Sequence, residues 1–115
     1  MLERLLRRLR RPAGGPAWLQ VGELRRRLDS GQVQLIIDVR GQDEFDGPLG
    51  HIPGAINVPL AALAERTAQL AQTALPIVLV CLTDKRSSQA AAALEAAGVR
   101  QVAVLQGGMR AWRGE

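Results

Sequence analysis

The chain has 115 residues, of which 47% are hydrophobic and 23% are charged, so it is long enough for one hydrophobic core but too short for two. Its net charge is +4, but residues 1–11 hold five arginines and one glutamate, which leaves the rest of the chain neutral. With only one phenylalanine and two tryptophans, that neutral body lacks a stacking surface for bases, and these counts exclude a nucleic-acid platform.

The numbers of cysteines and histidines limit the disulfide and metal sites, and the cellular compartment, that we expect. The only cysteine, Cys81, has no internal disulfide partner, and no signal peptide is visible, so a reducing cytoplasm is the simplest location. One cysteine and one histidine are too few for a zinc-type site, so no metal is expected. Since no apolar stretch approaches the length of a bilayer span, we expect a soluble protein.

Residues 1–11 predict a short amphipathic helix, because leucines recur on one face among the arginines. The leucines of this face are Leu2, Leu5, Leu6 and Leu9. A segment rich in proline and glycine follows, so we divide the chain into a basic N-terminal segment and linker, residues 1–16, and one domain, residues 17–115. The functional interpretation of the helix is binding to a membrane surface or a protein partner, and the structural alternative is a frayed or loosely docked end.

The rest of the chain alternates between helix and strand patterns. Helices are predicted over 21–28, over 60–72, from near Ser87 to 97, and as a last turn that carries Trp112. Strands are predicted over 33–39, 55–58, 76–80 and 102–105, with 41–54 as a loop. Continuous apolar strands that alternate with helices are typical of a parallel α/β sheet covered on both faces.

Chemically active side chains follow two of these strands. Asp38 and Arg40 end the strand over 33–39, and Cys81 directly follows the strand over 76–80. Because ligands bind at the carboxyl ends of parallel strands, these residues are expected to share one crevice. Lys85, Arg86 and the start of the next helix all favour a thiolate at Cys81, which indicates a nucleophile and not an inert buried cysteine.

Four segments, in order, resemble the signatures of the rhodanese family of single-domain sulfurtransferases. They are residues 35–40 with Glu44, residues 50–59, Cys81 with Arg86 and Ser87, and residues 105–108 with Trp112. The resemblance covers about residues 18–115 and implies a three-layer fold with a central, mostly parallel sheet flanked by helices. Four residues separate Cys81 from Arg86, whereas phosphatase-type loops place five there, and the shorter loop favours sulfur transfer over phosphoryl transfer.

The resemblance implies that Cys81 accepts a sulfane sulfur from thiosulfate or a persulfide, holds it as a covalent persulfide without any cofactor, and passes it to a thiol or cyanide. Backbone N–H groups of residues 82–86 would converge on that sulfur. Arg86 would close the loop by hydrogen bonds to its carbonyls and add a positive field, or would be purely structural. Ser87 fits an N-cap or first-turn position. The positions that would contact substrate are Leu82, Thr83, Asp84, Lys85 and Ser87.

Asp38, Arg40 and Glu44 are expected to support the catalytic loop, with an ion pair between Arg40 and Glu44 at its entrance. Such a pair is interpreted as structural, since exposed ion pairs contribute only about 0–1 kcal/mol. His51 lies in a turn set by glycine and proline, and we interpret it as structural and not as a general base.

Asp84 departs from the family pattern. The better thiosulfate enzymes of the family carry a basic residue early in the loop and a glycine three positions after the cysteine, where this chain has Leu82 and Asp84. Asp tolerates the left-handed backbone that glycine favours, at some cost, and its carboxylate would repel a thiosulfate dianion. Two alternatives therefore stay open beside the enzyme: a catalytically weak interaction or regulatory module, and a redox sensor that oxidises Cys81 to a sulfenate.

Overall fold

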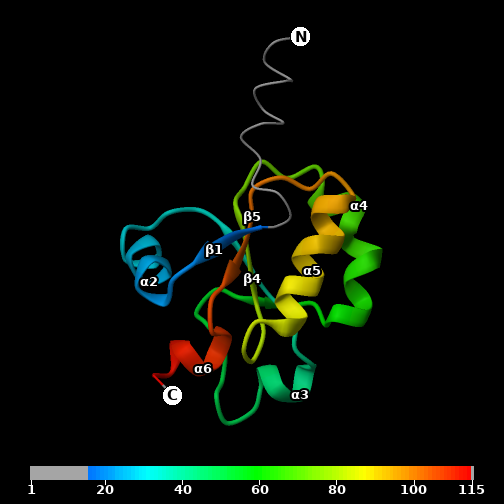
Figure 1. The fold of residues 1–115 in the computed structure, drawn as a ribbon. Helices are drawn as coiled ribbons and strands as arrows, with labels where there is room; N and C mark the ends of the chain where they lie inside the picture. Colours follow the sequence, from blue (N-terminus) through cyan, green and yellow to red (C-terminus); the bar gives the residue numbers. More distant parts are fainter. Residues whose placement is uncertain (1–15, 115) are drawn as a thin grey trace.

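The computed structural model describes residues 16–114, which form one all-parallel sheet of five strands in the order β1-β5-β4-β2-β3 (Figure 1). The strands are β1 (Ala17–Leu19), β2 (Leu35–Asp38), β3 (Ile56–Asn57), β4 (Ile77–Val80) and β5 (Val102–Leu105). The helix predicted over residues 1–11 lies outside the described residues.

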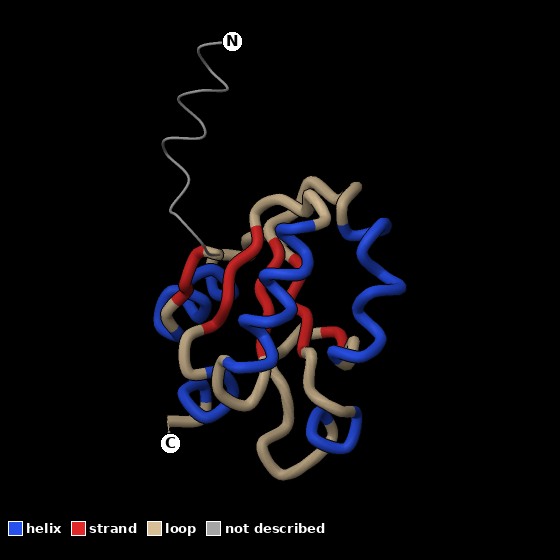
Figure 2. The backbone as a smooth tube through the Cα atoms, turned by 45° about the vertical axis from the view of Figure 1, so that its right-hand side comes forward, coloured by secondary structure: helices blue, strands red, loops and turns tan. Residues whose placement is uncertain are grey.

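Helices cover both faces of the sheet and give three layers (Figures 1 and 2). They are α2 (Val21–Asp29), α3 (Gln42–Phe45), the 3-10 helix η1 (Leu60–Arg66), α4 (Thr67–Leu70), α5 (Lys85–Ala96) and α6 (Gly108–Trp112). One face packs against α5, η1 and α4, and the other packs against α2 and α6. Within residues 16–114, no helix combines the length and the apolar character that crossing a bilayer requires.

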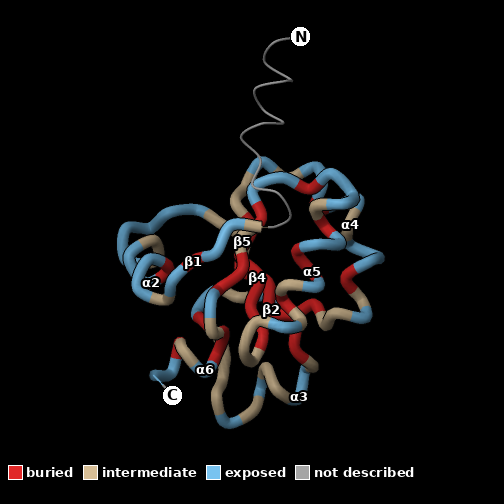
Figure 3. The backbone as a smooth tube through the Cα atoms, in the orientation of Figure 1, coloured by how far each residue is buried: buried red, intermediate tan, exposed pale blue. Residues whose placement is uncertain are grey.

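Alternating side chains of the central strands feed two separate cores. In β4, Ile77 and Leu79 join the core under α5, whereas Val78 and Val80 join the core under α2 and α6. All four residues of β4 are therefore buried, and Figure 3 shows the buried positions concentrated along the central strands. This two-sided burial explains the continuous apolar run of the sequence, because a strand covered on both faces has no polar side. It also places the carboxyl end of β4, where the Cys81 loop begins, between two packed cores.

The predicted α/β class, with a parallel sheet between helical layers, is confirmed. Three local elements of the structure differ from the prediction. The first strand, β1, was not predicted because it has only three residues and is defined by pairing with β5. The predicted loop over 41–54 contains α3, where the Glu44 side chain accepts a hydrogen bond from the Gly41 N–H at 3.2 Å. The predicted helix over 60–72 splits into η1 and α4.

Candidate active site

Cys81 lies at the carboxyl edge of the sheet, between β4 and the first turn of α5. Its side chain is buried, and its Sγ lies 3.3 Å from the Ser87 Oγ and 3.4 Å from the Ser87 backbone N, which donates to the sulfur. Helix α5 begins at Lys85, earlier than predicted, so Ser87 occupies the first turn and not the N-cap. The first-turn N–H groups of a helix have no acceptor within the helix, so this end of α5 is suited to a sulfur anion.

The loop that follows Cys81 is held from behind by α6. The Met109 N–H donates to the Cys81 carbonyl at 2.9 Å, and the Arg110 N–H donates to the Leu82 carbonyl at 3.1 Å. The chain contains no cis peptide bond among its described residues, and in a trans peptide the C=O and the following N–H point in opposite directions. The N–H groups of Leu82 and Thr83 therefore point away from α6. Of the predicted cradle, the Ser87 N–H contacts the sulfur, and the convergence of the other N–H groups stays a prediction.

Gly108 makes the close approach of α6 to this loop feasible. Its φ is +55°, in the left-handed region that favours glycine, and a Cβ there would overlap the carbonyl oxygens of Cys81 and Thr83. Gly107 and Gly108 belong to the fourth segment of the family pattern, so this glycine pair was visible in the sequence. Its contact with the Cys81 loop could not be predicted from the sequence, because the contact joins residues far apart in the chain.

Arg86 binds Glu44 of α3 through both terminal nitrogens, at 2.6 and 2.9 Å. These hydrogen bonds lower the pKa of Glu44 from 4.5 to about 2 and raise the pKa of Arg86, in each case against an opposing effect of burial. The predicted hydrogen bonds from Arg86 to loop carbonyls are wrong, because the carboxylate of Glu44 lies within reach and is the stronger acceptor. Much of the positive field expected from Arg86 is therefore neutralised.

Arg40 pairs with Asp38 and not with Glu44, so the predicted Arg40–Glu44 ion pair is wrong. Its Nε and Nη2 donate to the Asp38 carboxylate at 2.9 and 2.7 Å, and both side chains are 1% exposed. Nη2 also donates to the Gly50 carbonyl at 2.7 Å. The reason is local: Asp38 and Arg40 flank a single residue, so Arg40 folds back on Asp38, while Arg86 takes Glu44. The register that places Asp38 beside Val80 brings this pair next to Cys81.

Asn57, at the end of β3, was missed by the sequence analysis as a supporting residue. Its Nδ2 donates to the carbonyls of Asp38 and Arg40 at 3.0 and 2.8 Å, so it fixes the backbone on either side of Val39. The available signal was a single amide side chain inside the segment over 50–59.

The contacts of His51 support the interpretation of this residue as structural. Its ring stacks on Phe45 with a centroid separation of 3.6 Å, and its Nδ1 lies 2.9 Å from the Phe45 carbonyl oxygen.

The remaining predicted loop residues line the rim of the site. Leu82, Thr83 and Asp84 are half-buried, and Lys85 is exposed. Asp84 has φ −150° and ψ 7°, so its backbone is not left-handed and the expectation of a left-handed conformation at this position is wrong. The carboxylate of Asp84 makes no side-chain cap to α5. Its effect at the rim is therefore one of charge.

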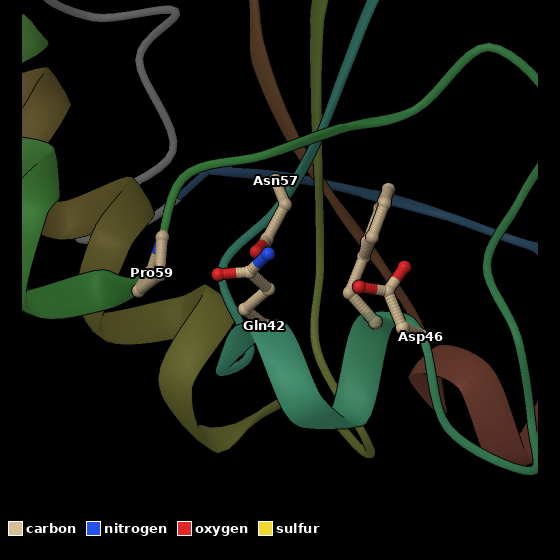
Figure 4. A pocket seen from close by; sticks show the side chains of 5 residues that line it. Gln42, Asp46, Asn57 and Pro59 are labelled. Atoms are coloured by element: carbon tan, nitrogen blue, oxygen red, sulfur yellow. The ribbon is translucent and has the colours of Figure 1, made fainter.

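A separate hollow of about 440 Å³ lies beside α3 (Figure 4). It is lined by Gln42, Phe45, Asp46, Asn57 and Pro59. None of these residues belongs to the Cys81 loop.

Comparison with known proteins gives consistent matches. A family model described as Rhodanese-like domain matches residues 20–115. The chain is 40% identical over 80 residues to "Uncharacterized protein YqhL" of Bacillus subtilis, which covers 70% of this chain and 61% of YqhL. It is 42% identical over 92 residues to "Probable adenylyltransferase/sulfurtransferase MoeZ" of Mycobacterium tuberculosis, which covers 78% of this chain and 23% of MoeZ. The chain thus spans less than two thirds of the length of both relatives.

Among solved structures, a rhodanese-like domain protein from Staphylococcus aureus superposes with a TM-score of 0.73 at 29% identity. The match covers 84% of this chain and 90% of that one. The agreement therefore extends over nearly the whole described fold, including the strand ends that carry the site.

We predict that Gly108→Ala destabilises the protein by about 2–4 kcal/mol, because the new methyl group meets the loop carbonyls in addition to left-handed strain. The matched control is Gly98→Ala, where φ is +89° but no atom lies within 4 Å of the position that the methyl group would take, so only about 1–2 kcal/mol of strain is expected. Urea unfolding of both variants measures the difference. Equal losses would mean that α6 does not hold the loop at Gly108.

We also predict that Glu44→Gln lowers the free energy of unfolding only where Glu44 is ionised in the wild type. Since the pKa of Glu44 is lowered to about 2 in the folded state, the stabilisation is fully present above pH 4.5 and is lost as the pH falls towards 2. The pair is more than one third exposed, so screening limits the effect to roughly 1 kcal/mol or less.

The measurement for this prediction is urea unfolding of wild type and Glu44→Gln between pH 7 and pH 2.5. Glu65→Gln, an exposed carboxylate on η1, is the control and should follow the wild type throughout. A stability difference at Glu44 that is independent of pH would contradict an ion-pair origin.

Proposed function

Because the chain belongs to the rhodanese-like domain family, we propose that it is a sulfurtransferase in which Cys81 carries a sulfane sulfur as a persulfide. The observation that carries this proposal is the buried Cys81 Sγ, in contact with the Ser87 hydroxyl and N–H, at the base of a loop whose carbonyls are bound by α6. The sulfurtransferase named in the relative MoeZ supports the same chemistry.

The first step loads the cysteine. The Cys81 thiolate forms a bond to the outer sulfur of a donor persulfide, the S–S bond of the donor breaks, and its electron pair leaves on the donor thiolate. The terminal sulfur that results carries the negative charge. It lies within the cradle of N–H groups from the loop and the first turn of α5, which stabilise an anion without moving.

The second step is directed by burial. Cys81 is 1% exposed, so an acceptor thiolate reaches the outer sulfur of the persulfide and not the Sγ beneath it. Attack there forms the new S–S bond on the acceptor and returns the electron pair to Sγ as a thiolate. The redox-sensor alternative would need a thiol from a partner, because Cys81 is the only cysteine of the chain.

The charges around the loop favour a donor of low charge over thiosulfate. Asp84 is negative, Lys85 is positive, and Arg86 is paired with Glu44, so the four groups sum to zero. A thiosulfate dianion gains no net attraction from them. A low-molecular-weight or protein persulfide, with less charge near the reacting sulfur, fits the site better. The alternative function, a catalytically weak interaction or regulatory module, is favoured by the same neutralisation of Arg86.

Intact mass measurement after incubation with glutathione persulfide or thiosulfate tests the proposal. We expect a gain of one sulfur atom that a reductant removes, larger with the persulfide, and absent in Cys81→Ser. If neither donor loads a Cys81 that still alkylates, the interaction-module alternative replaces the enzyme. A gain of one oxygen after peroxide, without any gain of sulfur, would support the redox sensor instead.

We predict that Asp84→Asn raises kcat/KM for thiosulfate and cyanide by roughly two- to tenfold, a change on the order of 1 kcal/mol in the attraction of a dianion. Because the backbone at Asp84 is not left-handed, Asp84→Gly should give a similar gain, since both variants remove the charge and neither relieves left-handed strain. Asp29→Asn, at the end of α2, is the control for net charge. A gain with Gly but not with Asn would show that backbone freedom, and not charge, limits the reaction.

A further inference from the structure

We propose that exposed arginines of α2 and α6 form a docking surface for an acidic protein segment that brings the sulfur acceptor to Cys81. The docking is a binding property of the surface itself, whereas its purpose rests on the proposed sulfur transfer. We name this the α2–α6 surface, and its exposed arginines are Arg25, Arg26, Arg110 and Arg113.

The α2–α6 surface adjoins the catalytic loop. Helix α6 contacts that loop directly, since the Arg110 N–H donates to the Leu82 carbonyl at 3.1 Å. Helix α2 reaches α6 through Arg25, whose guanidinium carbon lies 3.8 Å from the Trp112 ring centroid. Figure 1 shows both helices on the same side of the sheet, with α6 beside the loop between β4 and α5. A segment bound across α2 and α6 would therefore end near the opening of the site.

Two of the arginines are already ordered. Arg25 Nη2 donates to the Trp112 carbonyl at 2.6 Å, and Arg113 Nε donates to the Leu49 carbonyl at 2.8 Å. A guanidinium has five N–H donors, so each retains free donors for a carboxylate. An ordinary exposed arginine loses side-chain entropy when it binds a partner. Arg25 and Arg113 have already lost part of this entropy on folding, so the entropy cost of binding is smaller.

Charge is distributed unevenly about the site. Residues 21–29 and 108–113, which make up α2, α6 and its C-cap, hold five arginines and two carboxylates, an excess of three positive charges. Helix α3 with its C-cap, on the other side of the loop, holds three carboxylates and no basic residue. An acidic segment would thus be attracted to the α2–α6 surface and repelled from α3, which sets its direction of approach.

The composition of the surface favours protein carboxylates over a membrane or a nucleic acid. The exposed large hydrophobic residues of the described chain are Trp18, Val33 and Ile56, and none of them lies on α2 or α6. Trp112 itself is buried under Arg25. The surface therefore offers neither an apolar group to insert into lipid nor an aromatic ring to stack on a base. It does offer guanidinium forks, which match carboxylates geometrically.

Fluorescence anisotropy with the full chain tests the docking. The probes are a labelled peptide rich in glutamate and the same peptide with glutamine, and the variant is Arg26→Glu with Arg110→Glu. The control, Arg66→Glu with Arg100→Glu, makes the same charge change at exposed positions outside the α2–α6 surface. We expect the variant to weaken binding of the glutamate peptide at least tenfold and the control to weaken it less than twofold.

Three results would overturn this proposal. If the variant and the control weaken binding of the glutamate peptide equally, the binding is due to the net charge of the chain, to which the arginines of residues 1–11 contribute. Equal binding of the glutamine peptide would exclude carboxylate recognition. Tighter binding of a single-stranded oligonucleotide or of anionic vesicles, lost in the same variant, would identify a different kind of partner.

A transfer assay separates this proposal from the proposed function. Protein loaded with persulfide is mixed with cysteine peptides that carry a glutamate-rich or a glutamine-rich tail. We expect the ratio of kcat/KM for the two peptides to favour the acidic one and to fall about tenfold in the Arg26→Glu, Arg110→Glu variant. A ratio that the variant leaves unchanged would overturn the link between docking and transfer. If Cys81 never loads, the proposed function fails, while the anisotropy result still decides the docking.

Discussion

The site depends on the contact between the Cys81 loop and the start of α6. Two backbone N–H groups of α6 bind the first two carbonyls of the loop, and this is feasible only because Gly108 has no Cβ. Peptide geometry then points the N–H groups of Leu82 and Thr83 away from α6. The orientation of these N–H groups thus follows from packing against α6, and not from the loop sequence alone.

Two bidentate Arg–carboxylate pairs frame this loop, and their environments give them different roles. The Asp38–Arg40 pair is buried, and desolvation of the two charges offsets much of their attraction. Its main role is therefore to hold the end of β2 and the turn at Gly50 in position. The Glu44–Arg86 pair is partly exposed and fastens α3 to the first turn of α5. By neutralising Arg86, this pair would also reduce the attraction for a dianionic donor in the proposed sulfur transfer.

Burial of the cysteine and the surface charges act at different distances. In the proposed transfer, the burial of Cys81 would leave only the outer atom of a persulfide accessible. The arginines of the proposed docking surface on α2 and α6 would act on the partner as it approaches.

Local patterns in the chain were sufficient to predict the α/β class, the order of the central elements, and the position of Cys81 at a strand end. Those patterns are continuous apolar runs, helical periodicity, and a cysteine between a strand and a helix. The partners of Arg40, Glu44 and Arg86, and the contacts of Gly108 and Asn57, emerged only from the folded structure. The physical reason is that an ion pair or a backbone contact between distant residues depends on which acceptor the fold brings closest. No local pattern in the chain encodes that distance.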